Sequence, residues 1–327
     1  MARADEVARG LVGYLRGALG APALDLDGRP EPLGGGFDTE IHAFRLRGAP
    51  AGFERPLVLR VLRAHHDPAM VLREQATQNA VAAQGYPAPR VLLASADPAP
   101  LGAAFAIMER APGVPLVSRV VGMGGVLADA QARLHALDPT PLRGTLPVLD
   151  HYLDTLGRRV EAASLRGLAP LVAWLRAHRP PPEGVVICHG DFHPENVLVD
   201  GRAVSSVLDW PNALLAEPAF DVAATLNILR YVPAGIALAS PLRWLAAAGQ
   251  RVLAAQYLAR YRRRRPVAPG RLAYYEVATA LRALVRAAAV LAGVPGAPPP
   301  GALDRSPYAS RLLARAARIT GLSPSLP

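Results

Sequence analysis

The 327-residue sequence contains no lysine, a single cysteine and no apolar run long enough to cross a membrane. With Cys188 alone, the chain cannot form an internal disulfide framework or a cysteine-cluster metal site, so nothing points to an oxidising compartment. One extended uncharged window, residues 231–242, covers twelve positions and ends at Arg243, which is too short for a transmembrane helix. The opening segment carries Asp5 and Glu6 and lacks the apolar stretch of a signal peptide. We therefore expect a cytoplasmic protein without a transmembrane segment.

The missing lysines make every one of the 36 basic residues an arginine, set against 26 acids. The excess is local, since residues 212–327 hold 15 arginines and only four acids. A run of four arginines at residues 262–265 could suggest binding to nucleic acid or a membrane surface. No interleaved aromatic pattern accompanies it, so we expect a solvated helix end and no nucleic-acid partner. A hydrophobic content of 51% and a charged content of 19% are typical of a globular chain.

The most informative stretch is residues 185–200, V-V-I-C-H-G-D-F-H-P-E-N-V-L-V-D, followed by S-S-V-L-D-W at residues 205–210. Apolar runs alternate with a polar loop and a glycine turn, a pattern that predicts strand, loop, strand, turn and strand. This order brings Asp191, Asn196 and Asp209 to the same end of the strands. Phosphoryl transfer to a hydroxyl needs such a set, because one carboxylate accepts the proton while an amide oxygen and a second carboxylate hold Mg²⁺.

The spacing H-x-D-x-x-x-x-N with a later aspartate is that of the protein-kinase catalytic loop. It makes Asp191 the candidate catalytic residue and Asn196 and Asp209 the candidate metal ligands. The alternative is a buried polar loop in which the aspartate and the asparagine only cap a turn.

The run H-G-D-F-H-P-E-N-V-L-V-D followed by V-L-D-W resembles the signature of the aminoglycoside phosphotransferase-like kinases, small-molecule relatives of protein kinases. The resemblance implies an α+β, two-lobed, protein-kinase-like fold. Residues 1–110 would form a small nucleotide-binding lobe built on an antiparallel sheet. Residues 111–327 would form a larger, mostly helical lobe with the catalytic loop and the acceptor site. ATP and Mg²⁺ are the implied cofactors.

Three consecutive glycines, Gly34, Gly35 and Gly36, precede an alternating strand pattern and suggest a hairpin whose turn can approach a ligand closely. By the resemblance they would cover the ATP phosphates, and by themselves they are a simple turn. The segment E-R-A-P-G, which begins at Glu109, resembles the hinge between kinase lobes. Backbone groups from Glu109 to Ala111 would there meet the adenine edge.

The predicted strand at residues 56–62 carries Arg60 where kinases place a phosphate-binding lysine. Arginine keeps the charge but presents a planar fork, so the exchange is not neutral. The L-V-L-R form resembles a branch of the same superfamily that includes phosphotransferase domains joined to some acyl-CoA dehydrogenases. Arg60 is therefore a candidate phosphate ligand, with a solvated strand-edge arginine as the alternative. Glu74, on a predicted helix at residues 68–84, is either the partner of Arg60 or an exposed helical residue.

Four further residues are expected to be structural. Asp221 resembles the family's aspartate that braces the catalytic loop from a following helix. His189 is expected to steady Asp191, and His135 and Cys188 are expected to pack in the core.

These observations predict an ATP-dependent O-phosphotransferase that acts on the hydroxyl of a small molecule. Because aminoglycosides are polycations, the basic last third of the chain disfavours them and favours an anionic or neutral acceptor. A catalytically silent nucleotide-binding regulator is the alternative, supported by the missing lysine. A protein kinase is disfavoured because D-F-G and A-P-E segments are lacking. The sequence leaves the oligomeric state open.

Overall fold

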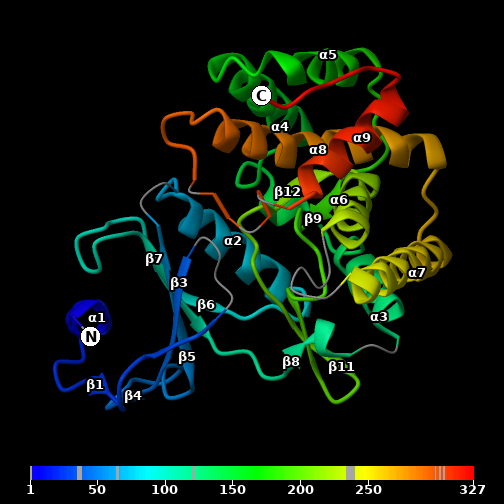
Figure 1. Cartoon of the computed structure of the whole chain (residues 1–327). Coiled ribbons are helices and arrows are strands. Elements are labelled where there is room, and N and C mark those ends of the chain that lie inside the picture. Colours follow the sequence, from blue (N-terminus) through cyan, green and yellow to red (C-terminus); the bar gives the residue numbers. More distant parts are fainter. Residues whose placement is uncertain are drawn as a thin grey trace. The chain divides into compact units, whose positions relative to one another are not determined.

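The computed structural model describes residues 2–34, 39–63, 66–119, 122–232, 240–298, 300–301, 303–304 and 306–327 (Figure 1). Gly35 and Gly36 lie outside the described residues. The chain forms two compact units, Met1–Gly113 with Ser205–Pro211, and Val114–Val204 with Asn212–Pro327. The first unit thus runs three residues beyond the predicted division after residue 110 and includes a later segment of the chain, which a division by sequence position does not capture.

The first unit is built on a five-stranded antiparallel sheet with the strand order β2-β3-β5-β7-β6, and β1 pairs with β4 beside it. Its strands are β1 (Asp25–Leu26), β2 (Glu31–Pro32), β3 (Thr39–Phe44), β4 (Leu46–Arg47), β5 (Leu57–Leu62), β6 (Val91–Ser95) and β7 (Phe105–Glu109). Its helices are α1 (Ala2–Leu19) and α2 (Met70–Ala83). The predicted strand at residues 56–62 and the predicted helix at residues 68–84 are confirmed as β5 and α2.

Alternation along β5 decides which side chains of the sheet reach the core and which reach the site. Leu57, Leu59 and Val61 belong to the buried cluster that contains Leu11 and Leu15 of α1. Successive strand residues point to opposite faces, so Arg60 faces the other side of the sheet. There it meets Glu74 of α2.

The second unit begins with β8 (Val114–Pro115), α3 (Met123–Leu134), α4 (Leu149–Ala162) and α5 (Ala169–Ala177). Three short 3₁₀ helices lie at Leu116–Ser118, Thr140–Leu142 and Arg166–Leu168. There follow β9 (Val186–Cys188), β10 (Val197–Asp200), β11 (Ala203–Val207), β12 (Leu214–Ala216), α6 (Pro218–Tyr231), α7 (Ser240–Arg264), α8 (Pro269–Leu291) and α9 (Tyr308–Thr320). β9 pairs with β12 and β10 with β8, both antiparallel. β11 carries the chain from the second unit into the first.

Helix α6 lies at the centre of the helical part, with α7, α8 and α9 packed around it (Figure 1). Most of its residues are buried, as expected of a helix that is apolar on all sides. The side-chain nitrogen of its polar Asn227 donates to the Glu276 carbonyl and to the Thr279 hydroxyl, both at 2.9 Å, while its side-chain oxygen is buried without a hydrogen-bond partner in the described ranges. The prediction of an α+β chain with a mostly helical second part is confirmed.

Strand β12 lies between Trp210 and α6 and pairs with β9. Pro241 lies in the first turn of α7, where a missing N–H costs nothing. The prediction of a solvated helix end at residues 262–265 needs refinement. The arginine run does end a helix, yet Arg264 pairs with Asp129 and Arg265 donates to the His135 carbonyl, so it is not wholly solvated. Within the described ranges, no helix combines the length and the apolar character needed to cross a bilayer.

Candidate active site

The loop after β9 is shaped by Gly190. Its backbone has φ of +76°, a conformation that glycine adopts without strain. A Cβ atom at this position would lie 2.3 Å from the Asn212 carbonyl oxygen, so no other residue fits. This close approach of Gly190 to Asn212, both in the second unit, positions Asp191, the next residue of the loop.

Asp221, in the first turn of α6, anchors this loop through hydrogen bonds. Its carboxylate accepts hydrogen bonds from the backbone N–H groups of His189 at 3.0 Å and Gly190 at 2.8 Å. It also contacts His135 Nε2 at 3.0 Å, and the other ring nitrogen of His135 lies 2.6 Å from the Tyr261 hydroxyl. Burial acts to raise the pKa of Asp221, but these bonds outweigh it and the pKa is lowered. The predicted structural roles of Asp221 and His135 are confirmed.

Asp191 presents a partly exposed carboxylate, with 27% of its side chain accessible. Its backbone is fixed at both ends, since its N–H donates to His189 Nδ1 at 3.3 Å and its carbonyl accepts from Asn196 at 3.0 Å. No donor among the described residues hydrogen-bonds to its side-chain oxygens. The nearest cation is Arg282 of α8, 3.8 Å from Oδ1. The carboxylate is therefore anchored yet available to a hydroxyl.

The side-chain nitrogen of Asn196 donates a hydrogen bond to the Asp191 carbonyl, so the side-chain oxygen of Asn196 points elsewhere. Within the described part of the chain, that oxygen has no hydrogen-bond partner. An amide oxygen of this kind is a hard ligand of the type that Mg²⁺ prefers. The geometry of Asn196 thus fits a metal ligand.

In the first unit, Arg60 lies between two carboxylates. One guanidinium nitrogen contacts Glu74 Oε1 and the other lies 2.8 Å from Asp209 Oδ1. The Arg60 side chain is 11% exposed and that of Glu74 is 1% exposed. Burial acts to lower the pKa of Arg60, but the two carboxylates outweigh it and the pKa is raised. The expected pairing of Arg60 with Glu74 is confirmed, and the exposed alternatives for both residues are wrong.

This three-residue cluster carries one positive and two negative formal charges. Glu74 Oε2 is buried without a hydrogen-bond partner among the described residues, and burial raises the pKa of Glu74 although Arg60 opposes the shift. Asp209 is 39% exposed and only one of its oxygens is bound to Arg60. A cluster with excess negative charge and a free carboxylate oxygen fits a divalent cation.

Asp209 has φ of +68°, which few residues other than glycine adopt. The neighbouring Trp210 stabilises this turn, because its backbone N–H points to Glu74 Oε1 at 3.4 Å and its indole donates to the Val207 carbonyl at 2.9 Å. Local strain of this kind concentrates at functional sites.

The remaining predicted nucleotide ligands also belong to the first unit. Gly34 lies in the turn after β2. The Glu109 side chain pairs with Arg55 at 2.6 Å and its N–H donates to the Arg90 carbonyl at 3.0 Å. The N–H of Ala111 has no hydrogen-bond partner in the described ranges, as a hinge donor requires.

Arg282 is a residue of this site that the sequence did not single out. It lies on a helix whose Leu281, Leu284 and Val285 are buried, and it donates to the Gly190 carbonyl at 3.0 Å. An arginine within an apolar helical stretch is an unusual signal that could have drawn attention to it. The predicted residues thus fall into two groups, with Asp191 and Asn196 in the second unit and Arg60, Glu74 and Asp209 in the first.

A second cluster, His135, Cys188 and Asp221, brings three potential metal ligands together in the core. Burial raises the pKa of the Cys188 thiol well above its ordinary value. The protonated thiol points to the Glu217 carbonyl at 3.6 Å, and the other two side chains bind one another. The expectation that Cys188 is a core residue is confirmed.

Comparison with known proteins identifies the class. Residues 31–267 match the phosphotransferase enzyme family, and the chain therefore belongs to that family. This membership confirms the resemblance noted in the catalytic-loop motif.

Two curated relatives match part of the chain. An N-acetylmuramate/N-acetylglucosamine kinase of Caulobacter vibrioides is 32% identical over 179 residues, which cover 45% of this chain and 47% of the relative. Acyl-CoA dehydrogenase family member 10 of Mus musculus is 29% identical over 173 residues, which cover 46% of this chain and 16% of the relative. The matches thus span less than half the length of either relative.

Solved structures share the fold. A thermostable mutant of an aminoglycoside phosphotransferase, in ternary complex with ADP and hygromycin B, has a TM-score of 0.63 at 19% identity and covers 95% of this chain and 98% of its own. A macrolide 2'-phosphotransferase from Brachybacterium faecium has a TM-score of 0.55 at 19% identity and covers 92% of this chain and 97% of its own. The kinase-like fold that the motif implied is confirmed.

Proposed function

We propose that this protein is an ATP-dependent O-phosphotransferase that phosphorylates the hydroxyl of a small molecule. The observation that carries the proposal is the Asp191 carboxylate, whose backbone is fixed on both sides while its oxygens remain open to an incoming hydroxyl. Family membership supports the reaction class, and a structural neighbour that holds ADP supports a nucleotide donor. Use of ATP fits a cytoplasmic location, which stays a prediction.

In this proposal Asp191 orients the acceptor hydroxyl and accepts its proton. Burial raises the pKa of the nearby Tyr308 to about 12, so at neutral pH this phenol is protonated and does not compete as the base. Arg282, 3.8 Å from Asp191 Oδ1, supplies positive charge beside the reacting groups. Charge placed in advance where it develops in a transition state is a large source of rate acceleration.

The nucleotide would be held by residues of the first unit. Gly34, with Gly35 and Gly36, would cover the phosphates, and backbone groups from Glu109 to Ala111 would meet the adenine. Arg60 would grip the phosphates from its position on β5, oriented there by Glu74.

Asn196 and Asp209 are each proposed as a ligand of Mg²⁺, which neutralises charge on the transferring phosphate when bound. Within the described ranges, the side-chain oxygen of Asn196 and one carboxylate oxygen of Asp209 have no hydrogen-bond partner, which supports this assignment. The fixed contact of Asp209 with Arg60 leaves the rest of its carboxylate for the ion.

The acceptor is proposed to be anionic or neutral. Residues 212–327 hold 15 arginines and four acids, a balance that repels a polycation. The structural neighbours that act on aminoglycosides and macrolides share less than 25% identity with this chain, so they support the fold and leave the acceptor to be argued from charge.

The test is phosphate transfer from labelled ATP in Mg²⁺ to a panel of cationic, neutral and anionic hydroxyl compounds. Asp191→Ala is expected to lower turnover by about 10²–10⁴-fold while the protein stays folded, because only the proton acceptor is removed. Asp200→Ala, at the exposed end of β10, is the matched control and should keep full turnover. Equal turnover in the wild type and the Asp191 variant contradicts the assignment.

A silent nucleotide-binding regulator is the second candidate, since both ends of the Arg60 fork are already bound to carboxylates. It predicts ATP binding without transfer to any acceptor in the panel. Loss of transfer in Asp209→Asn, with transfer in the wild type, rules this candidate out.

A further inference from the structure

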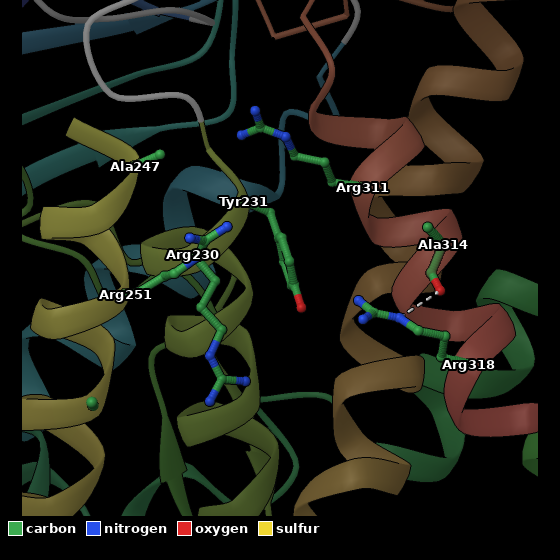
Figure 2. A pocket seen from close by; sticks show the side chains of 8 residues that line it. Arg230, Tyr231, Ala247, Arg251, Arg311, Ala314 and Arg318 are labelled. Carbon is green, nitrogen blue, oxygen red and sulfur yellow. Dashed lines mark hydrogen bonds between the residues drawn. The ribbon is translucent and has the colours of Figure 1, made fainter. Parts of the chain in front are cut away.

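A pocket of about 460 Å³ lies among α6, α7 and α9 of the second unit. Figure 2 shows arginine side chains around it, with the Tyr231 ring between Arg230 and Arg251 on one side and Arg318 on the other. The lining residues are Arg230, Tyr231, Arg251, Arg311 and Arg318, together with three alanines. Its polar walls are thus almost entirely cationic, and its apolar walls are small alanines that leave room for a ligand.

The positive charge of this arginine pocket is largely uncompensated. One buried carboxylate, Glu276, is shared between Arg230 at 2.9 Å and Arg315 at 2.6 Å. Arg251, Arg311 and Arg318 pair with no carboxylate in the described ranges, and Arg318 donates only to the Ala314 carbonyl, at 3.4 Å.

Like charges gathered in a concave surface repel one another and create a strong positive potential. An anion that enters the pocket removes this repulsion and can accept several charge-assisted hydrogen bonds at once. Guanidinium groups bind phosphate and carboxylate in this forked manner and remain charged at all physiological pH values. The pocket therefore has the chemistry of a site for a small organic anion with a phosphate or several carboxylates.

The pocket is also close to the catalytic loop along two helices. A small cavity that touches Gly190 is lined by Asn227 of α6 and by Tyr308 at the start of α9. Tyr231 and Arg311 of the arginine pocket follow these residues by four and three positions, about one helical turn or 5 Å along each helix. An elongated molecule whose hydroxyl lies at Asp191 could place its other end among the arginines.

We propose that the arginine pocket binds the anionic group of the phosphoryl acceptor, so that the acceptor is a hydroxyl compound that already carries a phosphate or several carboxylates. This inference rests on the proposed phosphotransferase function and specifies its substrate class. The same chemistry would also hold a free phosphate or pyrophosphate ion, and the experiment separates the two sources.

The first measurement is calorimetric binding of pyrophosphate to the whole protein without nucleotide. The double variant Arg251→Ala, Arg318→Ala should bind it about tenfold more weakly or worse, because two charge-assisted contacts are lost. Arg263→Ala, an exposed arginine of α7 outside the pocket, is the matched control and should bind as the wild type does. Equal binding by the double variant and the wild type overturns the pocket as an anion site.

The second measurement compares hydroxyl compounds with their own phosphate monoesters as acceptors. The monoester should have the lower KM, the double variant should raise that KM about tenfold or more while changing kcat little, and pyrophosphate should compete with the monoester. A monoester whose KM is no lower than that of its parent hydroxyl compound and is the same in both proteins overturns the inference and leaves the phosphotransferase assignment intact. Pyrophosphate binding in the pocket without competition against the acceptor also overturns the inference, because the pocket would then bind a free ion and not the acceptor.

If no acceptor is phosphorylated at all, the proposed function fails, and with it this assignment of the pocket.

Discussion

Arg60 of the first unit and the arginines of the pocket in the second unit are placed in opposite surroundings. Arg60 in the first unit is almost buried and lies between Glu74 and Asp209. In the second unit, Arg251, Arg311 and Arg318 surround an open pocket and have no carboxylate partner among the described residues. A buried charge requires partners, because the cost of removing it from water is otherwise prohibitive. An exposed charge without partners costs little, and it keeps its hydrogen-bonding capacity for a ligand.

The comparison separates an arginine that organises structure from arginines that are free to bind. The fork of Arg60 is fixed in advance by Glu74, which makes it a rigid part of the proposed nucleotide site. The arginine pocket can instead rearrange around an anion. Substitutions in the two places should therefore differ in kind, with loss of stability in the first and loss of binding in the second.

The largest effect is expected from Arg60→Met. This change leaves Glu74 buried beside Asp209 with no compensating cation, and removing one partner from a buried ion pair costs about 3–5 kcal/mol. Hydrogen exchange at the amides of β5 and α2 should accelerate, and thermal unfolding of the first unit should shift to lower temperature.

Arg55→Met provides the control in the same unit. Arg55 pairs with Glu109 at the surface, and such a pair contributes within about 1 kcal/mol. Equal destabilisation by the two variants would show that Arg60 contributes no more to the free energy of unfolding than a surface arginine does. The contrast between Arg60 and the arginines of the pocket would then not hold.

The sequence predicted the parts of the site that follow from local order. Asp191, Asn196 and Asp209 each lie within three residues of an apolar strand, so their placement could be inferred from alternation and turns. The helix that carries Glu74 was equally evident. What could not be inferred was that Glu74 is buried, because the burial depends on Arg60, fourteen residues away in sequence, and on Asp209, far along the chain.

The return of residues 205–211 to the first unit was missed for a similar reason. It depends on contacts distant in sequence, such as the hydrogen bond from the Val207 N–H to the Pro87 carbonyl at 2.7 Å. Strand β12 has only three residues, Leu214–Ala216, too few for a recognisable alternation. Arg282 is positioned by packing of α8, which no sequence motif records.

A smaller effect is expected from Asp129→Asn, which breaks a half-exposed cluster of the compensated kind. Asp129 of α3 binds Arg260 of α7 at 2.7 and 3.0 Å and Arg264 at 2.9 Å. Because 34% of the carboxylate is exposed, solvent screens the cluster and the loss is about 0.5 kcal/mol at neutral pH.

The pH dependence of this loss has a definite sign. Burial acts to raise the pKa of Asp129, but the bonds to Arg260 and Arg264 outweigh it and the pKa is lowered from 3.8. The stabilisation is therefore complete above 3.8 and disappears as the pH falls through the lower folded-state pKa. Unfolding of the wild type and the variant, compared from neutral pH downward, should converge in that range. A difference that grows on acidification is incompatible with this account.

The smallest change in stability is expected in the arginine pocket, although the effect there on ligand binding should be large. The double variant Arg251→Ala, Arg318→Ala removes two positive charges that have no carboxylate partner in the part of the chain that the structure describes, so stability should remain within about 0.5 kcal/mol or rise slightly. Any gain should shrink as salt is added, because salt screens the repulsion that the substitutions relieve. Thermal unfolding at low and high salt measures this directly. A loss comparable to that of Arg60→Met would mean that these arginines hold the helices together, and the distinction between organising and binding arginines would not apply to this protein.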